Sequence, residues 1–139
     1  MNKSNLNTNN KITKSVVEVK DLKVQFQLKD KVVKAVDGIS FNINKGETIA
    51  IVGESGSGKS VTALSLMRLT DYSGGKIVSG EINLQSKNNL NQNLTQLNQE
   101  KMRDIRGNDI SMIFQEPMTS LYPVFTIGMQ ITETIIKHQ

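Results

Sequence analysis

Apolar and polar residues alternate along the first part of the chain, after a polar lead. Apolar side chains stand at every second position in two stretches, formed by Leu22, Val24, Phe26 and Leu28 and then by Ile39, Phe41 and Ile43. A strand that buries one face requires this period of two, so the pattern predicts a small antiparallel β-layer. Residues 1–15 hold few apolar groups among Asn, Lys, Ser and Thr, and we expect them to form a disordered lead to one domain at residues 16–139.

The pattern changes at residues 48–52, where the sequence is rich in β-branched residues and does not alternate. A run of this kind is typical of a strand that is buried on both faces, as in a parallel sheet. A glycine-rich loop follows, and the apolar residues within 61–69 then recur at helical spacing. This change of period across one loop predicts a strand, a loop and a helix in succession. It therefore indicates an α/β fold with residues 48–52 as the central strand.

Three further elements are predicted in the second half of the chain. Residues 80–84 follow a turn and have the pattern of a short strand. Leucines at helical spacing predict an amphipathic helix over residues 94–106, which Gly107 ends. Residues 109–114 resemble a second buried strand, and isoleucines spaced from Ile127 onward mark the start of another helix.

The composition restricts the class of protein. The chain has 139 residues, of which 37% are hydrophobic, and it has no Cys, which excludes a disulfide framework or a thiolate metal site within these residues. Its net charge of +4 owes much to lysines of the lead, so a solvated N-terminus explains the charge better than a nucleic-acid surface does. The longest apolar runs span about five residues, far short of the ~18 that a membrane-spanning helix needs. A cytosolic location fits these observations, and any membrane contact would be peripheral or through a partner.

A phosphate-binding motif lies between the predicted central strand and the following helix. The pattern G-x-x-x-x-G-K-[ST] is matched by Gly53, Glu54, Ser55, Gly56, Ser57, Gly58, Lys59 and Ser60. Glycines let successive N–H groups point at one anion, and the helix adds its unpaired N–H groups and the positive end of its dipole. Lys59 would contact the β- and γ-phosphates, and the Ser60 hydroxyl would coordinate Mg²⁺. The alternative is a flexible Gly/Ser turn that contains the pattern by chance.

Longer stretches of sequence resemble one protein family. Residues 35–41, 46–48 and 51–60 resemble the start of an ATP-binding-cassette (ABC) transporter ATPase. Residues 110–121 resemble the Q-loop region of the oligopeptide and dipeptide importer ATPases, and the whole resemblance covers about residues 16–137. It implies a P-loop NTPase core sheet that is preceded by an antiparallel β-subdomain and is incomplete at its C-terminal end.

The resemblance assigns roles to two further residues. It identifies Gln115 as the Q-loop glutamine, which in the family contacts Mg²⁺ and the attacking water and links the nucleotide site to the transmembrane subunits. A side-chain amide suits this role because it can ligate a cation weakly and move without displacing a charge. Phe26 stands where the family carries the aromatic residue that stacks on adenine, and the alternative is a core Phe of the alternating strand. Tyr122 departs from the family, which usually has Asn before the proline of this loop.

Segments that the family uses for hydrolysis do not occur in these 139 residues. The family carries an apolar strand that ends in Asp-Glu, where the glutamate is the general base, then a switch histidine, and a Leu-Ser-Gly-Gly-Gln signature after the Q-loop. Residues 72–76 imitate that signature, but they precede the Q-loop and are interpreted as a turn that ends a helix. No catalytic residue is therefore assigned, and we expect the chain alone to bind Mg-ATP without hydrolysing it.

The resemblance implies the ATP-binding subunit of a peptide importer, which couples ATP hydrolysis to transport. Its partners would be transmembrane permease subunits, a second ABC ATPase subunit in a homo- or heterodimer and, indirectly, an extracellular solute-binding protein, with no nucleic acid. Its location would be the cytoplasmic side of the plasma membrane. Two alternatives remain open: a soluble ABC-type ATPase without a membrane partner, and a truncated, inactive product. The transported substrate, whether peptide, nickel or glutathione, does not follow from the sequence.

Overall fold

A four-stranded antiparallel sheet forms the centre of the structure. The computed structural model describes residues 15–116 and 121–138, so the predicted lead lies outside the described residues except for Ser15. The strands are β1 (Ser15–Gln27), β2 (Val32–Asn44), β3 (Gly75–Gln85) and β4 (Asn91–Asn93), in the order β2-β1-β3-β4. β1 pairs with both of its long neighbours, so the segment with period two is the middle of the sheet and the predicted β-layer is confirmed.

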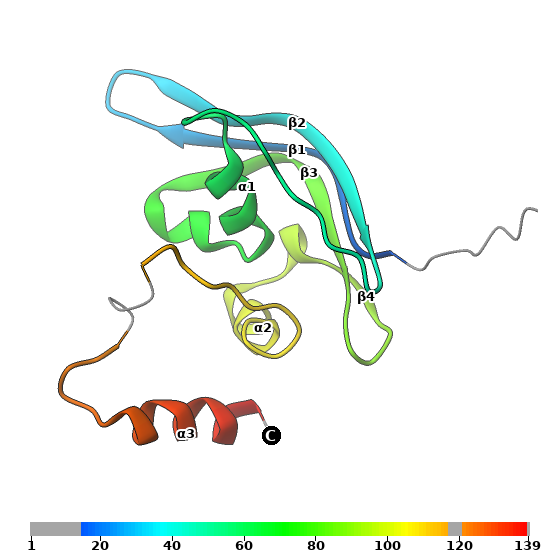
Figure 1. Ribbon diagram of the computed structural model, residues 1–139. Helices are drawn as coiled ribbons and strands as arrows, with labels where there is room; N and C mark the ends of the chain where they lie inside the picture. Colours follow the sequence, from blue (N-terminus) through cyan, green and yellow to red (C-terminus); the bar gives the residue numbers. More distant parts are fainter. Residues whose placement is uncertain (1–14, 117–120, 139) are drawn as a thin grey trace, which may run out of the picture.

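Short helices cover one face of this sheet (Figure 1). The helical segments of the described residues are α1 (Lys59–Leu66), the 3-10 turns η1 (Leu69–Ser73) and η2 (Leu94–Gln96), α2 (Gln99–Ile105) and α3 (Ile127–His138). In Figure 1, α1, η1 and α2 lie beneath the sheet, whereas α3 stands apart at the end of an extended segment. None of the helices within the described residues is long and apolar enough to cross a membrane.

The core lies between the sheet and these helices. Its buried side chains come from the inner face of three strands and from η2 and α2, and they are Val17, Val19, Leu22, Val24, Val36, Ile82, Leu84, Leu94, Met102 and Ile105. Val19 and Leu22 both face the core although their spacing breaks the alternation. The pairing of β1 with β2 shifts register between these two residues, where Asp21 adopts a φ of +44°, and this shift turns the Leu22 side chain to the core face. The bulge thus adds the extra residue that the sequence contains.

The prediction of a central strand at residues 48–52 is wrong for this structure. These residues belong to no strand, and Ile51 and Val52 are 46% and 87% exposed. A strand with two apolar faces is stable only where neighbouring strands and covering helices bury both of them. The described residues provide no such partners, so the apolar run stays at the surface.

The second predicted core strand, at residues 109–114, fails for the same reason. Its pairing is reduced to one parallel bridge between Ile110 and Arg106, and Ile113 is 92% exposed. The two segments that the sequence assigned to the core sheet therefore both lack strand partners. Exposed apolar edges of this kind are what an incomplete core sheet predicts.

The predicted helix at residues 94–106 is divided in two. Asn98 has extended backbone dihedrals (φ −75°, ψ 168°) and separates η2 from α2. Its side-chain oxygen accepts a hydrogen bond of 2.9 Å from the Lys101 N–H, which caps α2. α2 ends shortly before Gly107, whose φ is +82°, as predicted. Residues 80–84 lie within β3 and Ile127 begins α3, as predicted, whereas the helix predicted over residues 61–69 ends at Leu66.

Replacing Asn98 with alanine is expected to lower the free energy of unfolding by about 1 kcal/mol, because α2 loses its cap. Urea denaturation followed by circular dichroism measures the change. Asn88→Ala is the matched control, since Asn88 is exposed and its side chain makes no hydrogen bond within the described part of the chain. An equal loss in both variants would show that the cap contributes nothing.

Candidate nucleotide-binding site

The predicted phosphate-binding loop lies at the N-terminal end of α1. Gly58 is the residue immediately before the helix and has a φ of +90°, and Gly56 has a φ of +81°. Residues with a Cβ adopt such left-handed positions at a cost of roughly 1–2 kcal/mol. The two glycines therefore let the chain turn sharply from the loop into the helix.

Close contacts hold this loop compact. A Cβ placed on Gly58 would lie 2.4 Å from the carbonyl oxygen of Ala35 in β2, and one placed on Gly53 would lie 2.6 Å from Ser57 Oγ. At Gly58 the obstacle is a backbone oxygen, so that position has no room for a side chain, whereas at Gly53 the Ser57 hydroxyl can rotate away. Gly58 thus packs the end of the loop directly against the backbone of the sheet.

The N-terminus of α1 is open toward an anion. Gly58 offers no side-chain cap, and the first turn of the helix contains no acidic residue. The first N–H groups of a helix have no partner within the helix, and they carry the positive end of its dipole. In this helix no side chain satisfies or neutralises them, which suits a phosphate group.

Lys59 folds back over the loop. Its Nζ donates hydrogen bonds to the carbonyl oxygens of Gly53 at 2.8 Å and Glu54 at 2.6 Å, and it also donates to Ser57 Oγ at 3.4 Å. The ammonium is therefore held by acceptors of the loop itself. The next residue, Ser60, is exposed, and its hydroxyl makes no hydrogen bond to any residue that the structure describes. That hydroxyl is available as an oxygen ligand.

The segment that leads to Gln115 runs apart from this loop (Figure 1). In Figure 1 the loop stands beside the β1 and β2 hairpin, whereas the segment that leads to Gln115 passes below η1. Gln115 is exposed and forms no hydrogen bond with Lys59 or Ser60, all three of which are described. Its predicted position depends on residues 109–114 forming a core strand, and they do not. The shared role of Gln115 and Ser60 at Mg²⁺ stays a prediction.

Phe26 is half-buried at the end of β1 and packs against the core. A Cβ placed on Gly75 of β3 would lie 2.8 Å from the Phe26 ring, so the ring occupies the space above that glycine. This is the packing that the core interpretation predicts. Stacking of Phe26 on adenine stays a prediction.

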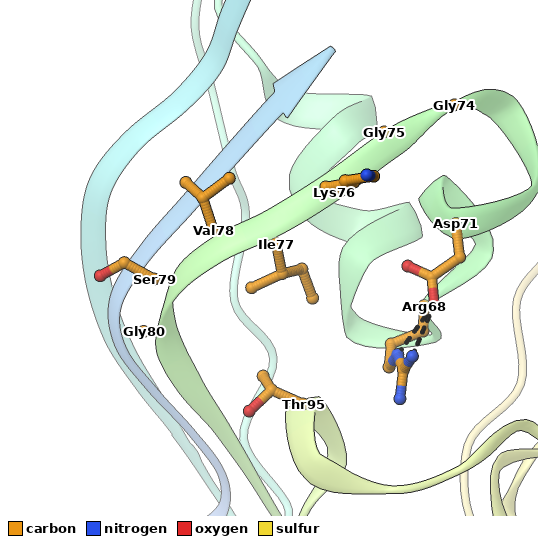
Figure 2. A pocket seen from close by; sticks show the side chains of 10 residues that line it. All are labelled: Arg68, Asp71, Gly74, Gly75, Lys76, Ile77, Val78, Ser79, Gly80 and Thr95. Atoms are coloured by element: carbon orange, nitrogen blue, oxygen red, sulfur yellow. Dashed lines mark hydrogen bonds and ion pairs between the residues drawn. The ribbon is translucent and has the colours of Figure 1, made fainter. Parts of the chain in front are cut away.

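A separate hollow of about 500 Å³ lies between η1 and β3 (Figure 2). Arg68, Asp71, residues 74–80 and Thr95 line it, and Arg68 and Asp71 form an ion pair of 2.7 Å at its edge. The hollow shares no residue with the loop at residues 53–60. It is therefore not part of the phosphate site, and no motif of the sequence points to it.

The comparison with known families shows the family of the chain. The ABC transporter family matches residues 36–137, which include most of β2, the loop, α1 and the segment that leads to Gln115. The chain belongs to the ABC transporter family. Family membership favours the interpretation of its glycine-rich loop as a nucleotide-binding motif over a turn that matches by chance, and the roles of the single loop residues stay predictions.

This ABC chain is similar to ATP-binding proteins of bacterial importers. It is 54% identical over 125 residues to the oligopeptide transport ATP-binding protein AppD of Bacillus subtilis, and the match covers 90% of this chain and 37% of AppD. It is 50% identical over 125 residues to the glutathione import ATP-binding protein GsiA of Escherichia coli K12, with 90% of this chain and 20% of GsiA covered. The chain therefore spans less than half the length of these relatives.

Solved ABC cassettes share its fold. The dimeric cassette MJ0796 in a post-hydrolysis state with ADP and Pi superposes with a TM-score of 0.70 at 24% identity, covering 88% of this chain and 48% of that one. A second dimeric structure of MJ0796, described as a bacterial ABC transporter cassette, gives a TM-score of 0.69. The predicted fold class is confirmed as a partial ABC fold. The sheet β2-β1-β3-β4 is its antiparallel β-subdomain.

Proposed function

We propose that this chain is the nucleotide-binding part of an ABC importer subunit, and that the whole protein couples ATP hydrolysis to the transport of peptides. Membership of the ABC transporter family supports the first statement. Similarity to proteins named for oligopeptide transport and glutathione import supports the second. The observation that carries the proposal is the compact loop at the open N-terminus of α1, with the Lys59 ammonium bound to it.

The loop suits a triphosphate for electrostatic reasons. The unpaired N–H groups at the start of α1 would donate to one phosphate group, where the helix dipole favours negative charge. The Lys59 ammonium would exchange the neutral carbonyl oxygens of Gly53 and Glu54 for charged phosphate oxygens. Charge-assisted hydrogen bonds are roughly twice as strong as neutral ones, so the exchange favours the bound nucleotide.

Ser60 is the residue of this site that fits a magnesium ion. Its hydroxyl is exposed and unpaired within the described residues, and Mg²⁺ takes oxygen ligands of this kind together with phosphate oxygens and water. When bound, Mg²⁺ supplies positive charge beside the β- and γ-phosphates. Gln115 is proposed as a further ligand, which requires residues 109–114 to pack closer to the loop than they do here. Phe26 is proposed as the stacking partner of adenine.

The proposal extends to the partners, the location and the cargo of the whole protein. The whole protein would work with transmembrane permease subunits on the cytoplasmic side of the plasma membrane, and indirectly with a solute-binding protein. It would pair with a second ATP-binding subunit, as the similar cassette MJ0796 does in its dimer. Peptides are proposed as the cargo because residues 110–121 and the 54% identity to AppD both favour them.

Titration calorimetry of the 139-residue chain tests the phosphate site. We expect saturable binding of one Mg-ATP per chain, at least about tenfold tighter than the binding of AMP, which is a difference of about 1.4 kcal/mol. The reason is that the proposed contacts are made to the β- and γ-phosphates, which AMP lacks. Equal affinity for the two nucleotides, or no binding of Mg-ATP, would contradict the proposed site.

A further inference from the structure

Arg106 contacts the C-terminal end of the helix that begins at the phosphate-binding loop. Its Nε donates to the carbonyl oxygen of Met67 at 2.8 Å, and its Nη2 donates to that of Arg68 at 3.3 Å. Met67 is the residue immediately after α1 and caps its C-terminal end. Arg106 therefore satisfies carbonyl groups that the end of a helix leaves unpaired.

The side chain of Arg106 is fixed from a second direction. The guanidinium lies 5.4 Å from the centre of the Tyr72 ring, and Nη1 donates to the Tyr72 hydroxyl at 3.2 Å. The same hydroxyl donates to Gln99 Oε1 at 2.9 Å, and Gln99 Nε2 donates to Asp71 Oδ2 at 3.0 Å. Because Asp71 also pairs with Arg68 (Figure 2), both arginines belong to one network of charged and polar groups.

The backbone of Arg106 begins the segment that leads to Gln115. It forms the parallel bridge with Ile110, and the N–H of Gly107 donates to the Ile110 carbonyl oxygen at 2.8 Å. Arg106 thus touches two parts of the ABC fold at once. Its side chain holds the end of α1, and its backbone sets the start of residues 110–115.

We propose that Arg106 is a positioning residue, which fixes the segment at residues 110–115 relative to α1. Nucleotide binding at the N-terminal end of α1 would then change the position of that segment. The inference rests on the proposed nucleotide site. A guanidinium suits the task because its planar fork can reach two carbonyl groups and a hydroxyl while it stacks on an aromatic ring. The helix between the loop and Met67 is short and continuous, and so transmits a displacement as one body.

A tryptophan reporter makes the coupling measurable. The chain has no Trp, and Phe114, next to Gln115, is half exposed, so Phe114→Trp gives a single fluorophore on the segment. In this reporter chain we expect Mg-ATP to shift the tryptophan emission. Adding Arg106→Leu should remove most of the shift while the calorimetric Kd for Mg-ATP changes by less than threefold. Arg106→Lys should restore less than half of the shift, since an ammonium cannot reproduce the fork and the stack.

Two controls separate positioning from folding. Arg103→Leu removes an exposed arginine from α2, the helix that Arg106 follows, and should leave the shift intact. If circular dichroism shows that Arg106→Leu unfolds the chain, Tyr72→Phe decides instead, because it removes only the hydroxyl and should reduce the shift by about half. A full shift in the folded Arg106→Leu variant, or none in the reporter chain although Mg-ATP binds, would overturn the inference alone. Failure of the reporter chain and the unmodified chain to bind Mg-ATP would overturn the nucleotide site, and the inference with it.

Discussion

Replacing Lys59 with alanine is expected to weaken Mg-ATP binding by at least about a hundredfold, or ~2.7 kcal/mol, which takes it beyond detection at ordinary protein concentrations. The substitution removes the only ammonium that bonds to the described loop, through Gly53 and Glu54. A phosphate group bound without it would keep the N–H donors of α1 but lose its charged partner, and hydrogen bonds to charged groups contribute ~1.5–3 kcal/mol each. Calorimetry with Mg-ATP measures the loss.

The control for this variant is Lys101→Ala, which removes an equal charge from the exposed face of α2. Its Kd should stay within about twofold of the unmodified chain, because exposed charges this far from the loop are largely screened by salt. Unchanged affinity in the Lys59→Ala chain would refute the assignment of the site. Equal weakening in both variants would mean that net charge rather than the loop binds the nucleotide.

Replacing Gly58 with alanine should cost both stability and binding. The new Cβ would lie 2.4 Å from the Ala35 carbonyl oxygen, and the residue has a left-handed φ of +90°. The backbone conformation alone costs roughly 1–2 kcal/mol, and forcing the loop away from β2 adds about 1–3 kcal/mol, as overpacking does elsewhere. We therefore expect a loss of about 2–5 kcal/mol in the free energy of unfolding, read from urea denaturation, and weaker Mg-ATP binding under native conditions.

Gly46 provides the matched control for the cost of the left-handed backbone conformation. Its φ is +77°, but a Cβ there would meet nothing within 4 Å. Gly46→Ala should therefore cost only the conformational part, about 1–2 kcal/mol, and leave the affinity for Mg-ATP unchanged. The difference between the two variants isolates the contact between the loop and the sheet. If both variants lose the same stability, that contact has no energetic weight.

The β-layer and the phosphate-binding loop could be predicted because their signals are local. The alternating residues of β1 need only a neighbouring strand on each side, and the hairpin supplies one of these directly. The loop is specified by eight consecutive residues that carry their own glycines and lysine. The prediction of a strand at residues 48–52 failed because the burial of such a strand depends on partners elsewhere in the fold, which a local pattern does not reveal.

The network around Arg106 escaped prediction for the opposite reason. Its acceptors Met67 and Tyr72 lie 39 and 34 residues earlier in the chain. An arginine after an amphipathic helix has the local pattern of an exposed basic residue near the last turn. The position of Gln115 could not be predicted either, because its motif specifies the chemistry of the residue and not the strand that presents it.

The unpaired run at residues 48–52 also affects how the protein behaves at high concentration. It carries no charge and no proline, it is rich in β-branched residues, and Ile51 and Val52 are exposed. Segments of this composition stack between chains as cross-β ribbons, because their free N–H and C=O groups find partners in another copy. Glu47 immediately before the run acts as a charged gatekeeper against such stacking. We therefore expect self-association through this segment to reduce the amount of chain available to bind nucleotide as the protein concentration rises.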